Sequence, residues 1–349
     1  MKRAVFIVAA ALVSLLLVEN VCVFAAAPGE SIVLDPNSGN YLITYCGIGP
    51  IGAKNTCVLH QEIFEPATKI NPRLKSHFIA NQFGPVTYRY AVKNRLGSRQ
   101  PLTIFILEPI SNIASSQPLP QSNAGISSSQ LPGLLAVGQA ALTTPSGWGG
   151  FENISIKGRG LHVAWSYDLR TVPPGLAPGY VQPGFGFSSN DLPGIISAHL
   201  VGHPSQSISF ADEGPQDDIS DQFDALQTKD FVVRYAAVPT IAVPTPFNRA
   251  ALLTSIESQV STWVGLGLLD SVVFTQIDGY LQAAIAAASR TDLTSCGIDV
   301  AAVRAQIRKI YALLDELPDD WAEPTESPLM AKLAARVLDF DLDYAIRHP

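Results

Sequence analysis

The sequence predicts an α+β protein whose two kinds of structure are segregated: an N-terminal antiparallel β-sandwich followed by a C-terminal antiparallel helical bundle. Most of the 26 prolines and 26 glycines fall in the first 250 residues, where they separate short apolar segments of period two. From residue 248 onward the hydrophobic period changes to about 3.6 residues, which indicates amphipathic helices. A chain of 349 residues is also long enough for about two domains.

The N-terminus resembles a secretory signal peptide. Lys2 and Arg3 precede an apolar run over residues 4–18, and small residues around Ala25 follow it. This layout predicts a signal peptide over residues 1–25 and a mature chain that is secreted, periplasmic or in the outer envelope. The alternative is an uncleaved membrane anchor, although the run is shorter than the ~20 residues that a spanning helix needs. No later stretch predicts a membrane span.

The cysteines that remain after export predict a disulfide. They are Cys46, Cys57 and Cys296, and an oxidising compartment favours pairing. Three pairings are possible in principle. We prefer Cys46 with Cys57, because the glycine-rich segment between them closes at modest entropic cost. Cys296 is then either a buried free thiol or a point of intermolecular linkage.

Residues 26–240 form the predicted β-sandwich domain. The clearest strand covers 86–94, where Val86, Tyr88 and Tyr90 share one face. The next, at 102–108, is apolar on both faces as in a central strand, and Pro109 is expected to end it. Further strand-like segments lie at 160–169, 185–189, 194–202, 206–212 and 231–238.

A stretch rich in Ser, Pro, Gln and Gly near 111–133 interrupts these strands and is predicted to be a flexible loop. At least seven short strands separated by turns are typical of an antiparallel sandwich, immunoglobulin-like in the loose sense.

A proline-rich linker over 241–247 precedes the predicted helical bundle of residues 248–349. Asn248 is a suitable cap for a first helix over 249–264, and a second is expected over 271–288. After a break from Thr291 to Gly297, Asp299 should cap a third helix. Ser327 with Pro328 should start a fourth.

The helical part is acidic, and this charge bears on partners. From residue 247 onward there are 8 Lys plus Arg against 14 Asp plus Glu, within a chain of net charge −7. Such a surface repels phosphate backbones, so nucleic acid is not an expected partner. A protein or a cell-surface glycan is compatible with it.

The densest cluster of possible metal ligands is the acidic run from residue 212 to 224. Calcium takes six to eight oxygen ligands, and a loop carrying several carboxylates can supply them. The run does not match an EF-hand loop, and the competing interpretation is a solvated loop between strands. The candidate calcium ligands are Asp212, Glu213, Asp217, Asp218 and Asp221.

No catalytic constellation is evident. His199 and His203 have the spacing of two zinc ligands on a helix, but residues 194–202 are predicted to be a strand, where that spacing separates them by roughly 13 Å. The chain has no GxSxG motif, and the nearest glycine-rich stretch centres on Trp148, which, like Trp165, we expect to anchor the core or a turn. A glycosidase needs two carboxylates across a cleft. The acids considered are Glu152, Asp168 and Asp191.

Several segments resemble known bacterial families. The strand TYRYAVKN, the SGW turn at 146–148, the aromatic strand around Trp165 and the PPG, GFGF and LPG steps between 173 and 194 resemble secreted bacterial β-sandwich proteins of unknown function. The segments 278–288, 303–317 and 329–338 resemble the C-terminal FIMAH-type helical module of bacterial secreted proteins. The resemblance implies a secreted bacterial architecture and assigns no functional residue.

These observations favour a non-catalytic structural or binding role in the bacterial envelope or exterior, with the sandwich as scaffold and the bundle as contact surface. The alternative is a secreted hydrolase of polysaccharide or peptide, which should gather the acids named above, or His199, in one cleft. No cofactor is expected, apart from the calcium already considered.

Overall fold

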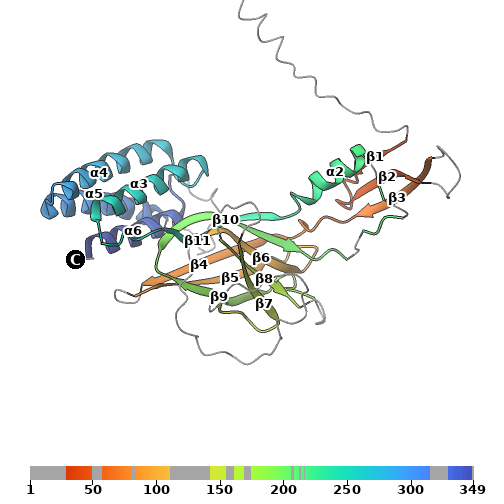
Figure 1. The fold of residues 1–349 in the computed structure, drawn as a ribbon, viewed down its shortest axis with the longest axis horizontal. Coiled ribbons are helices and arrows are strands. Elements are labelled where there is room, and N and C mark those ends of the chain that lie inside the picture. Colours follow the sequence, from red (N-terminus) through yellow and green to blue (C-terminus); the bar gives the residue numbers. More distant parts are fainter. Residues whose placement is uncertain are drawn as a thin grey trace, which may run out of the picture. The chain divides into compact units, whose positions relative to one another are not determined.

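In the computed structural model, the chain forms two compact units, whose elements are labelled in Figure 1. Unit 1 comprises residues 1–66 and 205–229, and unit 2 comprises residues 67–204 and 230–349. The structure describes residues 29–48, 57–80, 84–110, 142–154, 161–168, 174–205, 208–211, 214–215, 217–314 and 329–347. The predicted signal peptide and the predicted loop at 111–133 lie outside these residues.

Unit 1 contains a three-stranded antiparallel sheet with a helix beside it (Figure 1). Its elements are β1 (Ser31–Leu34), β2 (Tyr41–Ile48), β3 (Cys57–Phe64) and α2 (Asp217–Gln227). Alternate residues of a strand point to opposite faces, so one face of the sheet can be apolar and covered. Here Ile43, Tyr45 and Phe64 form a small core with Ile219 and Phe223 of α2.

Two antiparallel sheets make up the sandwich of unit 2, which confirms the predicted β-sandwich. The larger has the order β11-β10-β6-β8-β7 and the smaller the order β4-β5-β9. Their strands are β4 (Pro72–Ala80), β5 (Val86–Asn94), β6 (Leu102–Ile110), β7 (Trp148–Ile154), β8 (Leu161–Tyr167), β9 (Val181–Ser189), β10 (Leu192–Gly202) and β11 (Val232–Ile241).

Aromatic side chains fill the space between the two sheets. Tyr90 of β5 lies 5.7 Å from Phe105 of β6 and 6.1 Å from Trp165 of β8, measured between ring centroids. Trp148 meets Phe185 edge to face at 4.9 Å. Both tryptophans are buried, which confirms their predicted role as core anchors. Contacts of this geometry add stabilisation beyond the area that the rings bury.

Within the described residues, four helices follow the sandwich, as the sequence predicts: α3 (Arg249–Gly265), α4 (Ser271–Ser289), α5 (Leu293–Leu314) and α6 (Lys332–Arg347). Asn248 Oδ1 accepts the Ala251 amide at 3.0 Å, so the predicted cap of the first helix is confirmed. Arg304 ties α5 to α6, because its Nε and Nη1 donate to Asp339 at 2.7 Å and Asp343 at 2.9 Å.

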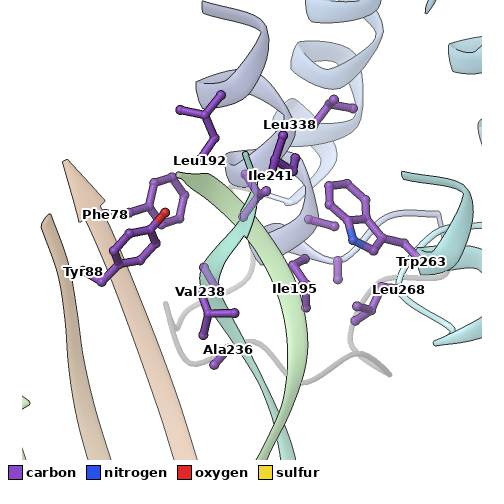
Figure 2. Packing of buried hydrophobic residues seen from close by; sticks show 14 of the residues in the cluster. Phe78, Tyr88, Leu192, Ile195, Ala236, Val238, Ile241, Trp263, Leu268 and Leu338 are labelled. Atoms are coloured by element: carbon purple, nitrogen blue, oxygen red, sulfur yellow. The ribbon is translucent and has the colours of Figure 1, made fainter. Parts of the chain in front are cut away.

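The helices and the sandwich share one continuous core. Figure 2 shows Trp263 of α3 and Leu268 beside Ile195 of β10, and Leu338 of α6 near Leu192 and Ile241. At the edge of this contact, Phe340 of α6 meets Phe78 of β4 edge to face, 5.1 Å between ring centroids. The bundle is therefore packed against the strands of unit 2.

This shared core gives boundaries that differ from the expected order of sandwich, linker and bundle. The bundle of residues 248–349 belongs to the same compact unit as β4–β11, whereas β1–β3 and α2 form the other. The reason is the apolar surface that β10 and β11 turn toward the helices, where Ile195 and Ile241 are buried.

Two strand predictions are wrong in part. β6 does not end before Pro109 but runs to Ile110, and its pairing with β8 shifts register between Leu107 and Ile110. An irregularity of this kind accommodates a proline within a sheet. The segment 206–212 was expected to be a strand, yet its described residues 208–211 are irregular. Residues of this segment pack in unit 1 instead, where the Phe210 ring contacts the Tyr45 ring edge to face, 5.2 Å between centroids.

Two helix starts also differ from prediction. α5 begins at Leu293 rather than near Asp299, because Asp292 Oδ1 accepts the Ser295 amide at 3.0 Å and caps it earlier. Gly297 then lies inside the helix, at a cost of about 1 kcal/mol relative to alanine. α6 begins at Lys332, because the preceding residues form a short bridge in which Met330 pairs with Leu269. Ser327 and Pro328 lie outside the described residues.

Candidate interaction surface

The sheet of unit 1 carries apolar side chains on both of its faces. Val33 of β1 is aligned with Leu42 of β2, which is aligned with Ile63 of β3, so the three side chains form a row across the sheet. This row lies opposite the covered face, because Leu42 alternates with the buried Ile43. We call the surface around the row the outer face; it comprises Ser31, Val33, Leu42, Thr44, Cys46, Cys57, Leu59, Gln61 and Ile63.

The apolar side chains of the outer face are exposed. The exposed fractions are 54% for Val33, 38% for Leu42, 46% for Ile63 and 51% for Leu59. An antiparallel sheet with one solvated face normally alternates apolar inward and polar outward. Contiguous exposed apolar side chains typically mark an interaction site. The outer face is therefore the candidate functional site of the chain.

A disulfide fixes the hairpin that carries much of this face. Cys46 and Cys57 are joined, with their Cα atoms 5.0 Å apart, which confirms the predicted pair. In the β2–β3 register Cys46 is opposite Leu59, so the bridge lies on the same face as the apolar row. The cross-link limits the motion of β3 relative to β2 and holds Leu59 in place.

The outer face carries no charge at the described positions of its three strands. The charged or titratable residues of β3, His60 and Glu62, fall on the inner face by alternation, since they pair with Tyr45 and Ile43. A surface without basic groups has little attraction for phosphate backbones or anionic lipids. The chemistry that it matches is another uncharged apolar surface.

The candidate calcium ligands fall at and before the start of α2. Asp218 and Asp221 belong to this helix, as does Asp217, whose side chain is outside the description. Asp212 and Glu213 also lie outside it. In the part of the chain that the structure describes, no three His, Cys, Asp or Glu side chains group around a possible metal position. Calcium binding here stays a prediction.

The solvated loop suggested for this acidic run is wrong over α2. Ile219, Phe223 and Leu226 recur at helical spacing and face the sheet of unit 1. The helical spacing of these apolar residues is present in the sequence, but the acidic residues around them favoured the loop interpretation.

The residues considered for hydrolysis are not brought together. Asp191 precedes β10 and His199 lies eight residues further along it, roughly 26 Å away at the rise of a strand. His199 of β10 is aligned with Ile106 of β6, which is aligned with Ala164 of β8. Asp168 follows β8, four residues beyond Ala164. It therefore lies ~13 Å beyond His199 along the strands, on the side away from Asp191. The side chain of Glu152 is not among those that the structure describes.

His199 is a structural histidine of β10, in the strand that the sequence predicts. Its ring stacks on Phe231 with 4.0 Å between centroids. Partial burial lowers the pKa of His199, and the nearby Glu108 opposes that shift. His203 lies beyond the end of β10, where its amide donates to the Pro101 carbonyl at 2.9 Å. The structure therefore gives these two histidines separate local roles.

One group that sequence reasoning missed is Asp341 of α6. It is 1% exposed, and its Oδ1 has no hydrogen-bond partner in the described structure. Burial raises the pKa of Asp341 well above its ordinary value. The sequence does hold a signal, because Asp341 follows Leu338 by three residues and precedes Ala345 by four, which places it on the apolar side of its helix.

Comparisons with known proteins identify no family. No family model matches the chain, and no curated protein matches it. A solved structure is similar to part of it: an uncharacterized protein from Nocardia farcinica with an immunoglobulin-like fold. The two share 17% identity over 41% of this chain and 92% of that one, with a TM-score of 0.24.

Within its described residues, the chain has no helix long and apolar enough to cross a membrane.

Proposed function

We propose that the chain is a non-catalytic binding protein of the bacterial envelope or exterior, and that the outer face of unit 1 is its contact surface. The observation that carries this proposal is the exposed row of Val33, Leu42 and Ile63 on an uncharged sheet face. Apolar residues at the centre of a contact supply most of the binding energy of a protein interface.

A location outside the cytoplasm is supported by two independent features. The N-terminal layout of Lys2, Arg3 and the apolar run at 4–18 is typical of an export signal. The disulfide between Cys46 and Cys57 is compatible with an oxidising compartment, where such bonds persist. The proposed resemblance of the helical part to a FIMAH-type module adds a bacterial origin, and it rests on the sequence segments alone.

The proposed partner is a protein with an apolar patch of its own. A glycan would bury hydroxyl groups, which cost free energy unless they find hydrogen-bond partners. The outer face offers few: Val33, Leu42, Leu59 and Ile63 are aliphatic, and the exposed Gln61 already donates to Thr44. It also lacks the basic residues that hold anionic lipid headgroups or nucleic acid. A second protein surface of matching shape is the remaining chemical class.

A non-catalytic role is favoured over the hydrolase alternative by the positions of the candidate groups. Asp168, Asp191 and His199 lie at separate places along β8 and β10, and a hydrolytic site needs such groups within one cleft.

Site-specific photo-cross-linking in intact source cells tests the proposal. A photoreactive residue replacing Leu59 should give a covalent adduct with a defined envelope or extracellular protein, and Ile63→Lys in the same chain should abolish it. The matched control places the photoreactive residue at Val272, which is 65% exposed on α4, and should give no such adduct. Equal adducts at both positions, adducts with lipid or glycan alone, or no adduct at Leu59 would overturn the proposal.

A further inference from the structure

The contact between α6 and the strands of unit 2 encloses a carboxyl group. α6 buries Leu338, Asp341 and Leu342 within the same core as the strand residues Leu192 and Ile241. Figure 2 shows Leu338 beside these two strand residues, three positions before Asp341 on the helix. Asp341 is therefore the polar member of an otherwise apolar contact.

Tyr88 of β5 is the titratable strand residue that interacts with Asp341, and Asp191, just before β10, interacts with Tyr88. Burial is the largest cause that raises the pKa of Tyr88, and Tyr90, Asp341 and Asp191 raise it further. The Tyr88 hydroxyl donates to the Asp191 carbonyl at 2.8 Å. The hydroxyl hydrogen of Tyr88 is therefore bound to the Asp191 carbonyl, and Asp341 Oδ1 accepts no hydrogen bond in the described structure.

Three arginines of the packed helices contact groups other than Asp341. Arg304 of α5 binds Asp339 and Asp343. Arg249 of α3 donates from Nε to the Ala345 carbonyl at 2.8 Å. Within α6, Arg336 lies over the Phe78 ring, 5.5 Å from its centroid. Lys332 begins α6, more than two turns before Asp341.

The strands that pack against α6 also keep their charges elsewhere. β4 presents Phe78 to Phe340, and its residues Arg73, Lys75 and His77 alternate to the opposite face. β10 carries His199 far along the strand, stacked on Phe231.

On β11, Arg234 Nε donates to the Pro72 carbonyl at 2.7 Å, and the Tyr235 hydroxyl donates to the Leu266 carbonyl at 3.1 Å.

We propose that Asp341 is a proton-operated latch: α6 stays docked on the strands while Asp341 carries its proton, and separates from them when the proton is lost. A neutral carboxyl can be enclosed at modest cost, whereas a buried carboxylate without a cation or hydrogen-bond donors is far more costly. When α6 separates from the strands, water solvates the Asp341 carboxylate. Ionisation of Asp341 and opening of α6 are therefore coupled.

The direction of this coupling follows from linkage. The pKa of Asp341 in the docked state is raised, while an exposed aspartate titrates near about 3.9. The docked state therefore holds a proton that the open state releases. Docking is most stable below pH ~4 and weakens as pH rises toward the raised pKa, by up to about tenfold in its equilibrium constant per pH unit.

Hydrogen–deuterium exchange of the full chain between pH 5 and pH 9 tests the latch, after correction for the intrinsic pH dependence of exchange. Peptides of α6 in the wild type should lose protection as pH rises, by up to about tenfold per unit. The same peptides in Asp341→Asn should show no such loss. Asp299→Asn, on α5, is the control and should behave as the wild type. Equal pH dependence in wild type and Asp341→Asn would overturn the proposal.

A second measurement needs no substitution. Infrared spectroscopy of the wild type should show the C=O stretch of a protonated carboxyl group at neutral pH. This band should disappear only at the pH where most molecules have α6 separated from the strands, above the range in which protection begins to fall. If the asparagine variant does not fold, Asp341→Leu replaces it in the exchange experiment. Absence of the band at neutral pH, or its persistence where the α6 peptides have lost all protection, would contradict the latch.

Discussion

Unit 1 and unit 2 stabilise their sheets by different means. In unit 1 the buried core consists of Ile43, Tyr45, Phe64, Ile219 and Phe223, and a disulfide joins two of its strands. Unit 2 encloses the aromatic centre of a sandwich and the apolar faces of four helices in one core. Its cysteine, Cys296, is buried as a free thiol, which agrees with the first of the two alternatives drawn from the sequence.

The difference follows from how much apolar surface each unit can bury. A small set of elements has a high ratio of surface to volume and gains little from burial, so it needs a covalent restraint. A larger unit reaches stability through packing alone. Among the described residues, unit 1 also leaves apolar side chains of one sheet face exposed, which suits a contact surface. The comparison predicts that each unit responds to a different kind of change.

The largest effect is expected from Trp165→Ala in unit 2. Trp165 is fully buried and stacks on Phe105 with 5.1 Å between centroids, so the substitution leaves a large cavity. We expect a loss of about 3–5 kcal/mol in the free energy of unfolding of unit 2. Denaturant titration read by hydrogen exchange measures β6 and β8 separately from β2 and β3. Phe151→Ala, at a half-exposed ring of β7, is the control, and an equal loss in unit 1 would contradict the comparison.

The converse change is Cys46→Ala with Cys57→Ala. Removing the bridge frees the chain between positions 11 apart and should cost unit 1 about 3 kcal/mol. The transition of unit 2 should stay in place, as calorimetry with and without a reductant can show. Reductant should reproduce the loss in the wild type and have no effect on the double variant. A wild type that is insensitive to complete reduction would show that unit 1 does not depend on its cross-link.

A smaller effect is expected on the stability of unit 2 at acidic pH. The pKa of His199 is lowered by burial, so the unfolded chain binds a proton more readily than the folded chain. The stabilisation is present above the ordinary pKa of about 6.5 and is lost as pH falls through the lowered value. His199→Phe preserves a ring against Phe231 and should remove this loss between pH 7 and pH 5. Melting curves that respond to acid equally in both chains would contradict the assignment.

How far the sequence predicts the fold depends on where each residue finds its partners. The strand at 86–94 and the helix capped by Asn248 were predicted because their signals are local. The start of α6 was not, since Met330 pairs with Leu269 some sixty positions earlier. A long-range bridge of this kind leaves no period in the sequence.

The candidate sites show the same limit. The pairing of Cys46 with Cys57 follows from their short separation, and it is confirmed. The outer face was not predicted, because the exposure of Val33 or Ile63 depends on which face of the sheet α2 covers. α2 itself was assigned to a loop, so the covered face was unknown. Asp341 could have been suspected from its place among apolar residues, but its lack of a partner is a tertiary property.

The division of the chain also sets the order in which unit 1 is completed during the proposed export. Unit 1 ends at residue 66 and resumes at residue 205, where the Ser205 amide and hydroxyl both donate to Glu65 at 2.7 Å. A chain that emerges from its N-terminus therefore makes β1–β3 long before α2 exists to cover them. During that interval both faces of the small sheet are bare, and the early pairing of Cys46 with Cys57 is what can hold the hairpin until Phe223 arrives.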